Sequence, residues 1–307
     1  MRKNLLKTIS NPFKNEKSKY LVSLIIYLAF GLTVTWSLQF YTFAKVNYGN
    51  PLFILIALIL CSWVPFFISL IIVLLFKIPL YFLALIPKIN KKIFWAIIVP
   101  LLTAAIGLQF SINFSQIFYQ DTSSIIFLSG NTIYGALHLF LVHPISIFLF
   151  TCIFAIGLEL QFRGALLEFC KVLGIPNGWL LAGAFQFICF LPFLWFGYFG
   201  GGDGNIFYCL IFAILFISQS GFCFWLSTFS DFMSKDKKSV NIKADTMRSL
   251  LVPMIYSCIF YIIYFFIVIK FFIENGNMWM SGPANGITVM IQSFITIFLL
   301  MTKRLKH

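Results

Sequence analysis

The sequence predicts an all-α, polytopic integral membrane protein with about eight transmembrane helices and both termini in the cytoplasm. Two observations carry this prediction. The first is composition, because 61% of the 307 residues are hydrophobic and only 10% are charged. The mean hydropathy of +0.96 is far above that of a soluble domain of this size. The second is that the basic residues gather in a few short segments between long apolar runs.

The apolar runs supply the spanning helices. A helix of about 20 apolar residues crosses a hydrocarbon core of about 30 Å, because each residue rises about 1.5 Å. Runs that are long enough, or nearly so, recur along the whole chain. They are Tyr20–Phe43, Pro51–Phe76, Ile93–Phe114, Tyr134–Leu158, Gly178–Phe199, Ile206–Phe232, Leu250–Phe272 and Ile287–Met301.

Between the second and third runs lies a shorter apolar segment, Ile78–Ile86, which cannot span a bilayer. It carries Pro79 near its start and is flanked by Lys77 and Lys88. Proline interrupts a helix, so two alternatives stay open. The segment is either a short interfacial helical turn or a kinked continuation of the second helix.

The distribution of Lys and Arg predicts the orientation, because cytoplasmic loops retain positive charge. Five segments hold 20 of the 22 basic residues, and all five fall on one side in an eight-helix arrangement. The two exceptions, Lys45 and Lys270, lie at opposite ends of their helices from these segments. The five segments are the N-terminal tail, Lys77–Lys92, Arg163–Lys171, Lys235–Arg248 and the C-terminal tail.

The formal net charge of +13 follows from this orientation and favours contact with anionic lipid headgroups of the bilayer. Nucleic acid is not an expected partner, since no loop is long enough to build a folded basic surface. The bias toward Phe, Ile, Lys and Asn suggests an AT-rich genome. We therefore expect a multi-pass protein of a bacterial plasma membrane.

No cofactor or metal site is expected. The seven cysteines form no CxxC pair and lie in or beside apolar segments, which is typical of small buried residues. His138 and His143 are five positions apart, so a helix would turn them about 140° away from one another. Such a pair does not ligate one metal, and we expect both to be packed between helices.

Glu159 and Arg163 are the strongest candidates for a functional site, because ionisable residues beside a spanning helix are costly. They are four positions apart with the acid first, which suits a salt bridge on one helix face. In the simplest interpretation the pair anchors a helix end, with Arg163 holding backbone carbonyls and headgroup phosphates.

The segment Glu159–Leu167 resembles the first motif of the CAAX prenyl endopeptidase and bacteriocin-processing (CPBP, or Abi) family of intramembrane proteases. Ala182–Pro192 is similar to the family's second motif helix, and Ser249–Ser257 to its third. The resemblance covers roughly residues 134–265. It implies a helical membrane core built around a hydrolytic site.

The same resemblance implies that most of the catalytic residues are missing. The glutamate expected to activate water falls on Leu158, and the histidine of the second motif falls on Phe190 or Cys189. In the third motif the histidine falls on Ser257 and the asparagine on Tyr261. Leu and Phe can neither take a proton from water nor stabilise an oxyanion.

Two functions stay open on this resemblance. The first is a pseudo-protease that binds a membrane protein, a lipidated peptide or a partner enzyme. Phenylalanines would then line or fill its cavity, namely Phe185, Phe187, Phe190 and Phe193. The second is a divergent endopeptidase or acyl-handling enzyme, with Glu159 as base, Ser257 and Tyr261 as polar partners, and Arg163 beside them. Against the second, a neighbouring Arg keeps the carboxylate charged and weakly basic.

The chain is thus divided into four parts. Residues 1–19 form a cytoplasmic basic tail, and residues 20–133 hold helices one to three with their loops. Residues 134–273 form the CPBP-like core with helices four to seven. Residues 274–307 comprise an outer loop, helix eight and the second cytoplasmic tail. No internal repeat is visible and intramembrane charges are few, so a transporter gains no support.

Overall fold

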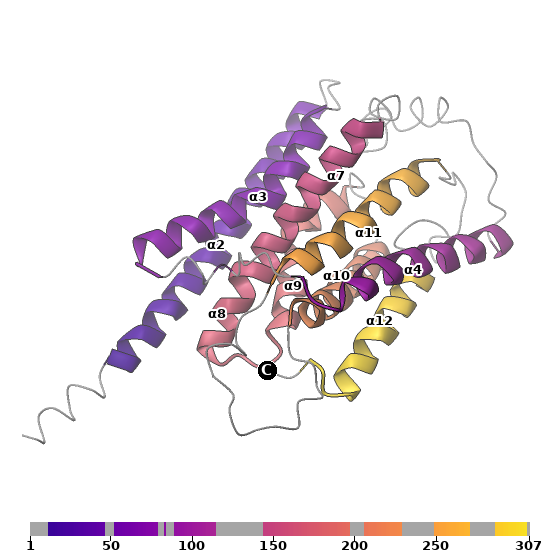
Figure 1. Ribbon diagram of the computed structural model, residues 1–307. Coiled ribbons are helices and arrows are strands. Elements are labelled where there is room, and N and C mark those ends of the chain that lie inside the picture. Colours follow the sequence, from indigo (N-terminus) through magenta and orange to yellow (C-terminus); the bar gives the residue numbers. More distant parts are fainter. Residues whose placement is uncertain are drawn as a thin grey trace, which may run out of the picture.

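The computed structural model describes residues 12–46, 52–78, 83, 89–114, 144–196, 206–228, 249–270 and 286–305. Every long element in this part is a helix, and each of the eight apolar runs contains one (Figure 1). The elements are α2 (Pro12–Val46), α3 (Leu52–Leu75), α4 (Ile93–Phe114), α7 (Pro144–Leu158), η2 (Glu159–Ala165), α8 (Leu166–Leu173), α9 (Gly178–Trp195), α10 (Ile206–Ser227), α11 (Leu251–Lys270) and α12 (Gly286–Met301).

Five stretches of helix are long and apolar enough to cross a membrane, judged by length and composition. They are Lys17–Lys45, Ile56–Leu75, Phe148–Leu173, Gly178–Trp195 and Cys209–Ser227. Three shorter apolar helices accompany them, at Ile93–Ile106, Leu251–Ile263 and Gly286–Met301. The prediction of an all-helical protein with several helices able to cross a membrane is therefore confirmed for the described residues, while the eight crossings and the cytoplasmic termini stay predictions.

The distribution of polarity suits a lipid environment. Large apolar side chains cover the outside, as Leu75 at 73% exposed and Phe294 at 71% illustrate. Polar side chains point inward instead, with Gln39, Glu159 and Gln292 fully buried. Water would favour the opposite arrangement, so the outer surface is matched to hydrocarbon.

The end of α3 decides between the two alternatives for the segment that follows it. Lys77 adopts a left-handed conformation with φ of 52°. The N–H of Ile78 donates to the carbonyl of Val73 at 2.8 Å, and that of Lys77 to Leu74 at 3.1 Å. This pattern is a Schellman motif, which ends a helix. The helix thus stops rather than kinking onward, and most of Ile78–Ile86 lies outside the described residues, as do His138 and His143.

Helix α9 contains Pro192, and α2 supplies the hydrogen bonds that this proline removes. Pro192 has no N–H, so the carbonyl of Ile188 lacks its usual helical donor. The indole N–H of Trp36 donates to that carbonyl at 2.8 Å. One turn along, the Gln39 amide donates to the Cys189 carbonyl at 2.6 Å and accepts from the backbone N–H that follows Pro192 at 3.0 Å. Backbone groups in hydrocarbon must find protein partners, and here α2 provides them.

Glycines mark the closest helix crossings. A Cβ on Gly183 of α9 would lie 2.5 Å from the Cα of Ile217 in α10. A Cβ on Gly221 of α10 would lie 2.7 Å from a methyl carbon of Thr296 in α12. Small residues permit such close packing between membrane helices, where dispersion replaces the hydrophobic effect as the driving force.

Three helices share one end of the bundle. Lys92, just before α4, donates from Nζ to the carbonyls of Trp225 at 2.8 Å and Thr228 at 2.7 Å, at the end of α10. A cation suits the carbonyls at a helix C-terminus. The end of α12 lies beside the same region, because Arg304 and Trp225 line one groove. In Figure 1, α4 and α12 lie on the side of the bundle away from α2 and α3.

Candidate functional site

The candidate site is built on a π-helix of seven residues, η2, inserted between α7 and α8. All seven of its residues are buried. A π-helical turn is rare and widens the helix, and such insertions are frequent at functional sites. The spacing of Glu159 and Arg163 predicts one face of an α-helix. The structure differs, because both residues lie on the wider π-helical turn.

The prediction that Arg163 belongs to a cytoplasmic connection is wrong. The helix continues past it through η2 and α8, and it ends in a Schellman motif at Gly174, whose φ is 72°. Arg163 is only 2% exposed, so it does not hold headgroup phosphates as a helix anchor would. A charge can be buried in this helix because its partner carboxylate is buried with it.

The salt bridge itself is confirmed. Arg163 donates to Oε1 of Glu159 at 3.0 Å. The same oxygen accepts a hydrogen bond of 2.5 Å from the hydroxyl of Ser257, which comes from α11. Glu159 is 0% exposed and Ser257 is 4% exposed. Two of the three partners predicted around Glu159 therefore meet at one carboxylate oxygen, and together they join η2 to α11.

Tyr261, the fourth predicted residue, lies one turn beyond Ser257 and is 3% exposed. It lies within electrostatic range of Arg163 and Glu159, and near the amide of Gln186. Its ring packs edge-on against Phe154 at 5.2 Å between centroids. The structure thus brings all four predicted residues into one region, with Tyr261 placed beside the ion pair rather than on it.

Several polar residues of this region were not singled out from the sequence. The thiol of Cys223 on α10 lies close to Ser257 and Glu159. The hydroxyl of Tyr256 lies near Arg163 and the Gln292 amide. Thiols and phenols within apolar runs are common packing residues, so the sequence alone does not distinguish these two. Glutamine within a spanning run was the available signal, since membrane helices use such amides to contact one another.

Eight buried residues of this region form what we call the polar centre: Glu159, Arg163, Gln186, Cys223, Tyr256, Ser257, Tyr261 and Gln292. In the described part of the chain, some of its hydrogen-bonding atoms have no partner. Oε2 of Glu159 and Nε of Arg163 are two of them. The side-chain amides of Gln186 and Gln292 are two more. An unsatisfied polar atom in an apolar interior costs about 1–3 kcal/mol. The centre is therefore costly wherever those atoms stay unpaired, and such clusters are often functional.

Three of the four phenylalanines expected around the site are buried. Phe190 is 1% exposed and packs edge-on against Phe154, with 6.2 Å between the ring centroids. Phe185 is 5% exposed and Phe193 is 0% exposed, whereas Phe187 is half-buried. Of the two expectations, lining or filling, packed rings favour filling.

We also considered metal ligands and cysteine thiols among the described residues. Among the described residues no three His, Cys, Asp or Glu side chains are grouped so that they could hold a metal ion. All seven cysteines are described and all are free thiols. Five are buried and two, Cys152 and Cys258, are half-buried.

No protein-family profile, curated protein or solved structure matches the chain. The site must therefore be interpreted from its own geometry.

Proposed function

We propose that the chain is a non-catalytic, CPBP-like protein of a bacterial plasma membrane that binds or scaffolds a membrane protein or lipidated peptide. One observation carries this proposal. The only carboxylate of the polar centre is held by Arg163 at 3.0 Å and by Ser257 at 2.5 Å while Glu159 is 0% exposed. A carboxylate held in this way stabilises the helix core.

The packing around the centre supports the same conclusion. A hydrolase must bring water and a scissile bond to its base, and a general base must reach the proton that it removes. Phe190 is buried where the family resemblance implies a proton-handling histidine. The polar contacts instead connect η2 with α11, and hence the first half of the CPBP-like core with the second.

The proposal includes eight crossings with both termini in the cytoplasm. Three helix ends that adjoin basic segments support this orientation. They are the start of α4 and the ends of α10 and α12, and they lie together at one end of the bundle. There Lys92 contacts the end of α10, and Arg304 lies beside Trp225. Basic residues that gather at one end are typical of the cytoplasmic face.

One observation favours a second function, a divergent intramembrane endopeptidase or acyl-handling enzyme. Ser257 donates to Glu159 at 2.5 Å, so a hydroxyl lies in direct hydrogen-bond contact with the candidate base. Tyr261 would then contribute a nearby hydroxyl. In this alternative the Glu159–Arg163 contact loosens before the carboxylate can accept a proton.

Glu159→Gln separates the two functions. The variant is expressed in the native cell, and its membrane abundance is measured together with the phenotype of a strain that lacks the chain. A scaffold predicts that any lost phenotype follows lost abundance, because the amide leaves Arg163 buried without its counter-charge. An enzyme predicts normal abundance with a lost phenotype, because the amide cannot act as a base.

Glu168→Gln is the matched control. Glu168 lies on the adjacent helix α8, partly exposed, and its carboxylate is 4.0 Å from the Lys171 amine. The substitution makes the same chemical change outside the polar centre and should leave abundance and phenotype unaltered. Normal abundance with a lost phenotype in Glu159→Gln, and not in Glu168→Gln, would overturn the scaffold proposal.

A further inference from the structure

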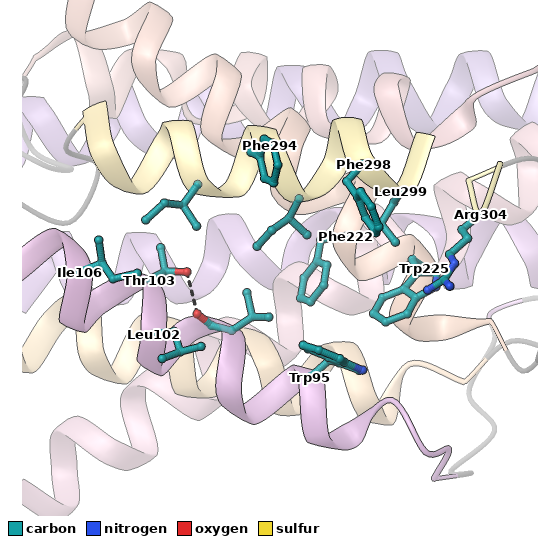
Figure 2. A pocket seen from close by; sticks show the side chains of 13 residues that line it. Trp95, Leu102, Thr103, Ile106, Phe222, Trp225, Phe294, Phe298, Leu299 and Arg304 are labelled. Atoms are coloured by element: carbon teal, nitrogen blue, oxygen red, sulfur yellow. Dashed lines mark hydrogen bonds between the residues drawn. The ribbon is translucent and has the colours of Figure 1, made fainter. Parts of the chain in front are cut away.

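A groove of about 320 Å³ runs between α4, α10 and α12 (Figure 2). Its walls are almost entirely apolar. Thr103 is the one hydroxyl residue among those that line it, and its hydroxyl donates to the carbonyl of Val99 within α4. The groove therefore offers an apolar ligand no polar group along its length.

One end of the groove carries a positive charge. Arg304, which follows α12, is exposed and lines this end beside Trp225. Figure 2 shows Arg304 and Trp225 at the same end, and Ile106 at the other. Among the described residues no acidic side chain forms an ion pair with Arg304. The groove is thus amphipathic along its axis, with a cation at one end and hydrocarbon beyond it.

Two tryptophans indicate that the Arg304 end of the groove lies at the membrane–water interface. Trp95 and Trp225 both line the groove near Arg304. Tryptophan concentrates at membrane–water interfaces, where its ring lies at the level of the headgroups. Arg304 would then reach the phosphates of the lipids around it.

The length of the groove matches one leaflet. Along α4 it extends from Trp95 to Ile106. Eleven residues of helix rise about 16 Å, which is close to half of the hydrocarbon core of about 30 Å. An acyl chain whose headgroup stays at the interface reaches the bilayer midplane over that depth.

We propose that this groove binds one acyl chain of an anionic phospholipid from the leaflet on the Arg304 side, with the headgroup phosphate on Arg304. Arginine forms charge-assisted, bidentate hydrogen bonds with phosphate. The apolar walls hold the acyl chain, and the guanidinium selects headgroups of net negative charge over those that carry a cation beside the phosphate. This site is independent of the Glu159 centre and of the scaffold function proposed for it.

The test is lipid binding to the purified full-length chain in mild detergent, measured by native mass spectrometry. Phosphatidylglycerol is compared with phosphatidylcholine carrying the same acyl chains. We expect one phosphatidylglycerol to be retained roughly tenfold more tightly, because the choline cation beside the phosphate of phosphatidylcholine repels Arg304. Equal retention of the two lipids by the unaltered chain would overturn the proposal.

Three variants separate headgroup recognition from general charge. Arg304→Gln should abolish the preference for phosphatidylglycerol. Lys303→Asn removes the neighbouring exposed cation, which does not line the groove, and should keep the preference. The backbone of Lys303 has a φ of 58°, a left-handed conformation that asparagine tolerates. Leu102→Trp, at a position 54% exposed, narrows the groove and should weaken both lipids.

Each of these positions is on the outside, so the variants should fold. An equal loss of preference in Arg304→Gln and Lys303→Asn would mean diffuse surface charge rather than a site. Unchanged binding in Leu102→Trp would mean that the chain lies elsewhere. Either outcome would contradict the assignment.

Discussion

The hydroxyl of Ser257 donates a hydrogen bond of 2.5 Å to a carboxylate oxygen of Glu159, a residue 98 positions earlier in the chain. This contact joins the π-helix η2 to α11. Arg163 donates to the same oxygen, so one buried atom accepts hydrogen bonds from both side chains. The stability of the core should therefore respond to changes at either donor.

Ser257→Ala removes one of the two donors to Oε1 of Glu159. We expect the free energy of unfolding to fall by about 1–2 kcal/mol, since hydrogen bonds to charged groups are strong but those between membrane helices measure below 2 kcal/mol. The unfolding temperature in mild detergent measures this. Cys258→Ala, at the half-buried next position, is the control and should have a smaller effect. Equal unfolding temperatures for Ser257→Ala and the unaltered chain would contradict the contact.

Arg163→Gln leaves the Glu159 carboxylate buried without a counter-charge. Breaking a buried pair on one side costs about 3–5 kcal/mol. We therefore expect little folded protein, measured as the monodisperse fraction in size-exclusion chromatography. Glu159→Gln together with Arg163→Gln removes both charges and should recover much of that fraction. A double variant that folds as poorly as Arg163→Gln alone would show that the charges do not stabilise each other.

Gln39→Leu removes both hydrogen bonds that the Gln39 amide makes to the backbone around Pro192 and leaves the bond from Trp36. We expect a loss of about 1–3 kcal/mol, because buried backbone groups are left unpaired. Pro192→Ala restores an N–H to α9, so Gln39→Leu should cost less in that background. The four unfolding temperatures of this double-mutant cycle measure the coupling. Additive effects would mean that Gln39 does not compensate for the proline.

Gly183→Ala places a methyl group against the backbone of α10, 2.5 Å from a Cα atom. Helices that must move apart to admit it should lose about 1–3 kcal/mol of stability. Gly31→Ala is the control, because its nearest neighbour would be a Phe185 ring carbon at 3.4 Å. That substitution should be neutral or stabilising, since alanine favours a helix over glycine. The measurement is again thermal unfolding.

Labelling from outside the cell tests the predicted orientation. Lys45→Cys should react with a membrane-impermeant maleimide in intact cells, and Lys303→Cys only after lysis. The background should carry alanine at Cys152 and Cys258, because the other five native thiols are buried. Labelling of Lys303→Cys in intact cells would place the C-terminus outside.

The sequence predicted the helices better than their contacts. Hydrocarbon thickness sets the length of an apolar run, so each run overlaps a helix that the structure describes, although α2 begins at Pro12 and the fourth helix continues to Leu173. Glu159 and Arg163 could also be paired in advance, because four positions along a helix bring side chains together. Both predictions depend on local geometry alone.

What the sequence left undetermined depends on contacts between distant segments. Arg163 was assigned to a connection because a charge after an apolar run usually marks its end. Arg163 is buried because it pairs with a carboxylate on a π-helical turn. Residue spacing predicts neither that turn nor how deeply the side chain is buried. The amides of Gln186 and Gln292 were overlooked for a similar reason. A neutral side chain shows its partners only once the helices are packed.

The bridge from α2 to α9 has a consequence for biogenesis. When α9 emerges from the ribosome, Pro192 leaves its neighbouring carbonyl and amide unpaired at a depth where water cannot reach them. Trp36 and Gln39 were synthesised about 150 residues earlier, and α2 is already available to receive α9. Insertion and tertiary assembly of α9 are thereby coupled. A chain that lost α2 would deliver α9 to the bilayer with unpaired backbone groups, each of which costs several kcal/mol in hydrocarbon.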